Sequence, residues 1–118
     1  MPTESLDLVQ GTVDVLVLQT LAWGPMHGYA VASWIRQRTD GVLELEDAPL
    51  YKALHRLERQ GCVVAEWGLS ENNRRARYYQ LTPAGAAQLS ARASAWRRYA
   101  DAVCRVLEPP RAPGTARP

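Results

Sequence analysis

The spacing of apolar residues in this chain changes from helical to strand-like and back again, and this change most limits how the chain can fold. Up to Gly61, apolar residues recur at three- and four-residue intervals, which is typical of amphipathic helices. Two short runs, residues 62–67 and 75–81, then have the composition of β-strands. Helical spacing returns after Thr82 and Pro83, a helix cap followed by a first-turn proline. The chain is therefore predicted to be mainly α-helical with one small β-hairpin.

Three helices are predicted before the hairpin, over residues 11–23, 27–38 and 49–60. Thr12 is the candidate N-cap of the first helix. This helix is apolar on two faces, so it must be buried on two sides, and in so small a protein the second face indicates a partner chain. Between the second and third helices, residues 42–46 are short, alternating and acidic, which predicts a brief strand.

A long helix is predicted after the hairpin. It spans about 26 residues, or roughly 39 Å at 1.5 Å per residue. The four prolines of the last ten residues follow it, and no residue there can form a core, so we expect a disordered tail. This order of elements matches a winged helix-turn-helix followed by a C-terminal helix. We divide the chain into a winged helix-turn-helix domain over residues 8–82, a dimerisation helix over 83–108 and a tail over 109–118.

The helix predicted over residues 49–60 separates its apolar and basic side chains. At about 100° per residue, Leu50, Leu54 and Leu57 form one narrow stripe, and the basic residues fall opposite it. Arg and Lys on a helix in the major groove bind guanine edges and phosphates. The alternative is a solvated charged face. The candidate DNA-binding residues of this helix are Tyr51, Lys52, His55, Arg56 and Arg59.

The loop between the two predicted strands gathers three arginines, Arg74, Arg75 and Arg77. Like charges at a hairpin tip repel each other unless an anion approaches, and a hairpin lying along DNA would use them. The alternative is that the charges protect an edge strand from pairing. Residues 1–47 carry a net charge of −5 and residues 48–98 a net charge of +6, which favours an anionic partner for the middle of the chain.

The long C-terminal helix gives an independent indication of dimerisation. Its apolar residues follow each other at intervals of 4, 3, 4, 3 and 4, which is the heptad spacing of a coiled-coil seam. A two-fold dimer would bury this seam together with the second face of the first helix. The alternative is a helix folded back on its own domain. The candidate dimer-interface residues are Val15, Leu18, Leu89, Ala93, Trp96, Ala100, Val103 and Leu107.

Four segments together resemble the PadR family of winged helix-turn-helix transcriptional regulators. These are GTVDVLVL at residues 11–18, GPMHGY at 24–29, LYKALHRLE at 50–58 and RARYYQLTPAG at 75–85. The resemblance implies a homodimer that binds a palindromic operator in double-stranded DNA, usually as a repressor. It also implies that the helix beginning at Pro49 reads the major groove and that the arginine loop is the wing.

The resemblance also bears on single residues. Tyr51 matches a tyrosine of the family that touches DNA. Pro49 stands where the family usually has a small hydroxyl residue or glycine, and Lys52 stands where a proline often follows the tyrosine. These departures concern which operator is read. In some relatives, aromatic groups between the helices bind flat drug-like molecules, which makes Trp96 a candidate for binding a small aromatic effector; the alternative is plain packing.

Other classes of function lack a matching pattern. No paired carboxylates, Ser-His-Asp set or phosphate-binding glycine loop has a suitable context, so we expect neither an enzyme nor a cofactor. The two histidines are too few for a metal site, and Cys62 and Cys104 are interpreted as buried or inert thiols. With no membrane-length apolar run and no secretion signal, we expect a cytoplasmic protein. The alternative function is a winged-helix interaction module that binds an acidic protein.

Overall fold

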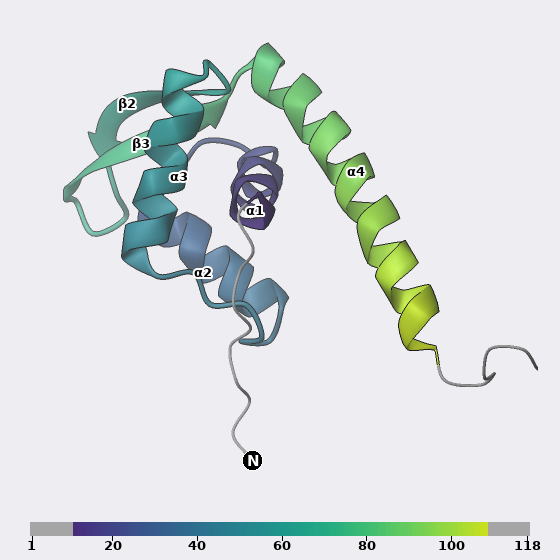
Figure 1. Cartoon of the computed structure of the whole chain (residues 1–118). Coiled ribbons are helices and arrows are strands. Elements are labelled where there is room, and N and C mark those ends of the chain that lie inside the picture. The colour runs from purple at the N-terminus through teal and green to yellow at the C-terminus, as the bar shows by residue number, and fades with distance from the viewer. Residues whose placement is uncertain (1–10, 109–118) are drawn as a thin grey trace, which may run out of the picture.

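The computed structural model describes residues 11–108; residues 1–10 and 109–118, including the expected tail, lie outside the described part. Figure 1 shows a cluster of helices beside a small sheet, with one long helix at the edge. This is the predicted mainly α architecture with a small β wing. The elements are α1 (Thr12–Leu21), β1 (Met26–His27), α2 (Gly28–Arg38), α3 (Asp47–Arg59), β2 (Val63–Leu69), β3 (Arg75–Leu81) and α4 (Pro83–Leu107).

The core lies where α1, α2 and α3 meet against one face of the sheet. Val17 of α1, Val31 of α2 and Leu54 of α3 have no exposed surface. Tyr79 of β3 is almost fully buried in the same cluster, so the sheet closes the core on its remaining side. Burying a side chain of this size stabilises the fold by about 1.5–3 kcal/mol. The core therefore holds the apolar face of α3 against the rest of the domain.

The second apolar face of α1 belongs mainly to the core of its own chain. Leu18 has no exposed surface, so the prediction that it contacts a partner chain is wrong. The physical reason is that α1 contacts α2, α3 and α4 within one chain and is covered on several sides. Val15 is half-buried and lines a groove beside α4. A partner chain is thus not needed to bury most of α1.

The sheet is antiparallel and three-stranded, in the order β1-β3-β2. In the hairpin, Val63 of β2 lies opposite Leu81 of β3, and Leu69 lies opposite Arg75. The two-residue strand β1 pairs with the other edge of β3, next to the start of α2. The sequence pattern did not predict β1, because two residues carry no measurable period. This strand ties the wing to the helix-turn-helix.

Two local predictions are wrong. Residues 42–46 form bends and irregular chain instead of a brief strand, and the Thr39 hydroxyl holds this segment by accepting a hydrogen bond from the Leu43 N–H at 3.1 Å. At the start of α1, Gly11 occupies the N-cap position with a φ of 94°, and no side chain caps the helix there. The hydroxyl of Thr12 faces α4 instead.

Helix α4 is anchored at its first turns. The Thr82 hydroxyl accepts a hydrogen bond from the Gly85 N–H at 3.0 Å and donates one to the Gly61 carbonyl at 2.7 Å. Gly85 is buried, and a Cβ there would lie 2.0 Å from the Cys62 carbonyl oxygen, so only glycine permits this approach. Residues 101–108 at the other end are all exposed. Helix α4 is therefore held at its base, and its last turns stand free of the domain (Figure 1).

Candidate nucleic-acid interface

Helix α3 separates its two kinds of side chain as the sequence predicts. Its buried residues are Leu50, Ala53, Leu54 and Leu57. Lys52, His55 and Arg59 are exposed on the other side. Because the leucines are fixed in the core, the polar residues are presented on a rigid helix rather than on a loop. Two of the five candidate residues of α3, Tyr51 and Arg56, have more specific surroundings.

Tyr51 is held against the start of α2. Its side chain is 39% exposed, and its ring lies so close to Gly28 that a Cβ on that glycine would come within 2.4 Å of the phenol oxygen. Burial, with smaller contributions from Tyr79 and Asp47, raises the pKa of the Tyr51 phenol above its ordinary value of 10.0. The hydroxyl is therefore a neutral hydrogen-bonding group near pH 7, and the residue remains partly exposed.

Arg56 does not point outward with the other basic residues, so that prediction is wrong. It donates two hydrogen bonds to Asp14 of α1, from Nη2 to Oδ1 at 2.5 Å and from Nε to Oδ2 at 3.4 Å. The bonds to Asp14 raise the pKa of the guanidinium above its ordinary value, against a smaller opposing effect of burial. A projection of one helix could not show this pair, because the acceptor lies on another helix.

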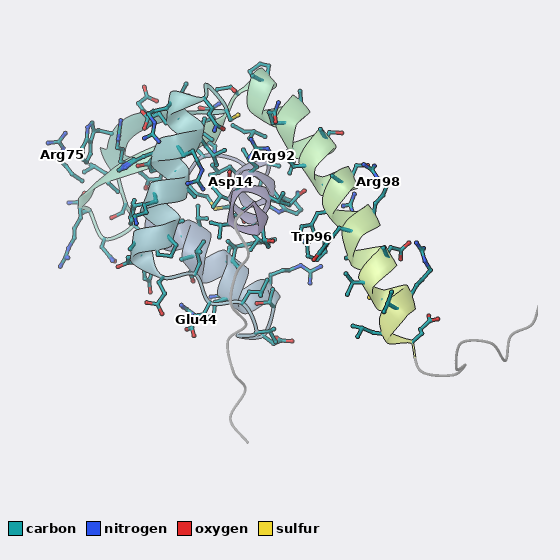
Figure 2. All side chains as sticks on the ribbon, viewed as in Figure 1. Asp14, Glu44, Arg75, Arg92, Trp96 and Arg98 are labelled. Atoms are coloured by element: carbon teal, nitrogen blue, oxygen red, sulfur yellow. The ribbon has the colours of Figure 1, made fainter. Side chains whose placement is uncertain are left out.

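The wing holds its arginines in three different ways. Arg74 is exposed at the tip, where Asn73 adopts a positive φ of 62°. The guanidinium of Arg75 stacks over the Trp67 ring at 4.6 Å from the centroid, and it lies at the outer edge of the molecule (Figure 2). Arg77 donates a hydrogen bond of 2.9 Å to a carboxylate oxygen of α3. The wing is therefore braced against α3 and keeps two of its cations at the surface.

The acceptor of the Arg77 bond is Glu58, which lies in the last turns of α3. The side chains of this ion pair are 38% and 31% exposed, so solvent screens the pair and its contribution to stability is small. Its structural effect is to link the hairpin to α3.

An open groove of about 650 Å³ runs between α3 and the wing. Its lining includes Tyr51 and His55 of α3 and all three wing arginines. Sequence reasoning missed three aromatic residues that also line it, His27, Tyr29 and Trp67. The GPMHGY segment was the available signal for the first two. The groove combines guanidinium groups with flat rings, which suits contact with phosphates, sugars and base edges.

His27 organises the helix side of this groove. Its Nδ1 accepts a hydrogen bond from the Ala30 N–H at 3.2 Å and so caps α2. Its ring lies 6.5 Å from the Tyr29 ring and 5.3 Å from the Tyr78 ring, between centroids. The contact between the His27 and Tyr78 rings thereby joins the start of α2 to strand β3.

A second groove, of about 870 Å³, lies between α1 and α4. Trp96 extends from α4 toward α1 (Figure 2), where its indole N–H donates a hydrogen bond of 3.1 Å to the Thr12 hydroxyl. Trp96 is 44% exposed, and Val15 and Tyr99 line the same groove. The candidate effector residue is therefore part of a real concavity.

The predicted seam of α4 divides into two parts. Leu89 packs against the core of its own domain, and Ala93 and Ala100 are half-buried. Val103 and Leu107, in contrast, are exposed. The alternative that α4 folds back on its own domain thus describes its first half, and the exposed apolar residues lie in its second half.

Two smaller expectations concern other chemistry. Cys62 is buried, whereas Cys104 is exposed on α4, so for Cys104 only the alternative of an inert thiol remains, and it stays a prediction. Within residues 11–108, no cluster of three or more His, Cys, Asp or Glu side chains has the geometry to hold a metal ion. In the same described part of the chain, no helix has the length and apolar character needed to cross a membrane.

Known proteins resemble this chain in sequence and in structure. A model of the PadR-like transcriptional regulator family matches residues 17–91, which is more than half of the chain. An uncharacterized protein of Lysinibacillus sphaericus is 26% identical over 102 residues, which cover 86% of this chain and 94% of that protein.

Solved structures of transcriptional regulators share the fold. One from Clostridium thermocellum has a TM-score of 0.76 and 28% sequence identity, covering 84% of this chain and 96% of that one. A PadR family regulator from Eggerthella lenta has a TM-score of 0.69 and 31% identity, covering 86% of each chain. The predicted winged-helix fold with a long C-terminal helix is thereby confirmed.

Proposed function

The chain belongs to the PadR-like family of transcriptional regulators, as its sequence predicts, and we propose that it acts by binding double-stranded DNA. Two copies would bind a palindromic operator and repress transcription there, in the cytoplasm, until a small aromatic effector releases them. The family consists of transcriptional regulators rather than enzymes, and the proposed activity is accordingly binding without catalysis.

The observation that carries this proposal is the groove between α3 and the wing. One wall is a rigid helix with an exposed polar face, and the other is a hairpin with guanidinium groups. A helix with its side chains is about 10–12 Å across, and the major groove of B-DNA is about 12 Å wide. Helix α3 would therefore enter the major groove while the hairpin lies along the adjacent backbone.

Positions on α3 and on the hairpin give the residues different roles. Lys52, His55 and Arg59 would reach base edges and phosphates from α3. Arg74 and Arg75, at the wing tip, would bind the backbone or minor groove. Changes in the first group should alter which sequence is preferred, and changes in the second should weaken binding to all sequences.

Tyr51 and Arg77 contribute through fixed positions. Tyr51 is held by Gly28, and Arg77 is held by Glu58. Side chains that are already ordered lose less conformational entropy when a complex forms. Both side chains would therefore already be in position when the DNA binds.

The proposed homodimer rests on the second half of α4. Val103 and Leu107 are exposed apolar residues at heptad spacing, and Trp96 and Ala100 continue the same stripe toward the domain. A second copy packed antiparallel or parallel on this stripe would cover it. The same copy would close the groove between α1 and α4, where Trp96 offers an indole face to a flat aromatic effector.

The experiment that tests DNA binding is selection from a random duplex library, followed by fluorescence anisotropy. The selected duplex is titrated against a scrambled one at salt concentrations from about 50 to 300 mM, because phosphate contacts make affinity fall steeply with salt. We expect tight binding of the selected duplex and weaker binding of the scrambled one. Failure to enrich any duplex would contradict DNA binding and would favour an acidic protein as the ligand of the groove.

A further inference from the structure

Asp14 of α1 is a meeting point for two other helices. Arg56 of α3 binds it through Nη2 and Nε, and Nη1 of Arg92 of α4 binds its Oδ2 at 2.9 Å. In Figure 2, Arg92 extends from α4 to the position of Asp14 beside α1. One carboxylate therefore joins the proposed recognition helix to the proposed dimerisation helix.

The surroundings make this carboxylate sensitive to its partners. Only 9% of the Asp14 side chain is exposed, so water can replace a lost guanidinium poorly. Arg92 also donates a hydrogen bond of 3.4 Å to the Gln60 side chain, at the C-cap of α3. A displacement of α4 that withdraws Arg92 would leave Asp14 with Arg56 alone and would break the bond to the Gln60 side chain.

We propose that Asp14 is a positioning residue that couples the placement of α4 to the orientation of α3, so that operator affinity depends on both of its arginine bonds. This inference rests on the proposed DNA binding. It gives Arg56 and Arg92 the role of linking α3 and α4 through Asp14, instead of a role in contacting phosphates. Any event that moves α4, such as closure of the groove around Trp96, would reach α3 through this carboxylate.

The substitution Asp14→Asn tests the inference by the sign of its effect. Removing a negative charge from a DNA-binding protein strengthens DNA binding by simple electrostatics. Loss of the coupling predicts the opposite. We expect at least about a fivefold loss of affinity for the selected duplex, the lower end of typical coupling between sites. The matched control is Asp40→Asn, which removes one charge from an exposed turn after α2.

A second pair of variants tests the same coupling without changing Asp14, so the result does not depend on whether Asp14→Asn disturbs folding. Arg92→Met removes the α4 bond to Asp14, and Arg98→Met removes one charge from the side of α4 turned away from α1 (Figure 2). We expect Arg92→Met to weaken operator binding about fivefold more than Arg98→Met does. Because neither residue is assigned to a phosphate, the salt slope of both variants should match that of the wild type.

Affinity is measured on protein shown by thermal unfolding to be folded at the assay temperature. Weaker binding by folded Asp14→Asn and Arg92→Met, with normal binding by both controls, supports the coupling. Affinities of those two variants equal to the wild type would overturn it while leaving the proposed function intact. A wild-type protein that enriches no duplex would overturn the proposed function itself.

Discussion

At the scale of single residues, the contact between Tyr51 and Gly28 has an unusual consequence. Alanine normally stabilises a helix relative to glycine by about 0.5–1 kcal/mol. At position 28, however, the added Cβ would collide with the tip of the Tyr51 side chain and force the ring to move, so we expect Gly28→Ala to destabilise the protein by about 1 kcal/mol. Urea unfolding measures the change. The double variant Gly28→Ala/Tyr51→Ala should lose less than the sum of the single changes, and strict additivity would argue against the collision.

The same tyrosine predicts a dependence on alkaline pH. Its folded-state pKa is raised above the ordinary value of 10.0, mainly by burial, so the folded state holds the phenolic proton more tightly than the unfolded chain does. Its contribution to stability is present below about pH 10 and is lost as pH rises through the raised folded-state pKa.

Urea unfolding at successive pH values from about 8 to 11 should therefore show a decline that is smaller in Tyr51→Phe than in the wild type. Tyr29→Phe is the matched control, because Tyr29 is 72% exposed. An identical decline in Tyr51→Phe and wild type would contradict this assignment.

At the scale of elements, the free end of α4 carries the dimer prediction. Val103 lies on the exposed apolar stripe, and Ala102 lies off the stripe, about 100° around the helix from Val103, with both residues exposed. A carboxylate buried in a coiled-coil seam has no partner and is costly. Val103→Asp should therefore convert a dimer to a monomer in size exclusion with light scattering, whereas Ala102→Asp should remain dimeric. Equal behaviour of the two variants would place the interface elsewhere.

The elements also show what sequence reasoning can reach. Helices with several turns of apolar spacing, such as α3, and strands with residues to pair, such as β3, follow from local pattern alone. Residues 42–46 were misread because alternation over so short a stretch occurs in loops as well. The outward prediction for Arg56 failed for another reason. Its partner Asp14 lies 42 residues away, and tertiary contacts of that kind leave no trace in the spacing of one helix.

The candidate site, like the fold, could be predicted from the sequence only in part. The basic face of α3 and the arginines of the wing could be read from composition and helical projection. The bracing of Arg77 by Glu58 and the rings of Tyr29 and Trp67 in the groove could not, because they depend on the angle between hairpin and helix. The pairing of β1 and the packing of Tyr79 set that angle. Neither feature can be recognised as part of the site from the spacing of residues in the sequence.

At the scale of the whole molecule, a two-fold dimer fixes the distance between its two α3 helices. Recognition helices of such dimers enter successive major grooves about 34 Å apart, which is about 10 base pairs. Inserting about five base pairs at the centre of the selected duplex turns one half-site to the opposite side of the DNA. We expect its affinity to fall to that of a single half-site, measured by fluorescence anisotropy on both duplexes.

The control is a duplex of the original length whose central base pairs are replaced rather than extended, and it should bind nearly as tightly as the selected duplex. Insertion of a full turn of about 10 base pairs puts both half-sites back on the same side of the DNA but doubles the distance between them. Because α4 is anchored to the domain by Thr82, Gly85 and Asp14, it cannot lengthen to follow, and binding should stay weak. Full affinity for both extended duplexes would mean that the two half-sites are read independently and that α4 does not set their spacing.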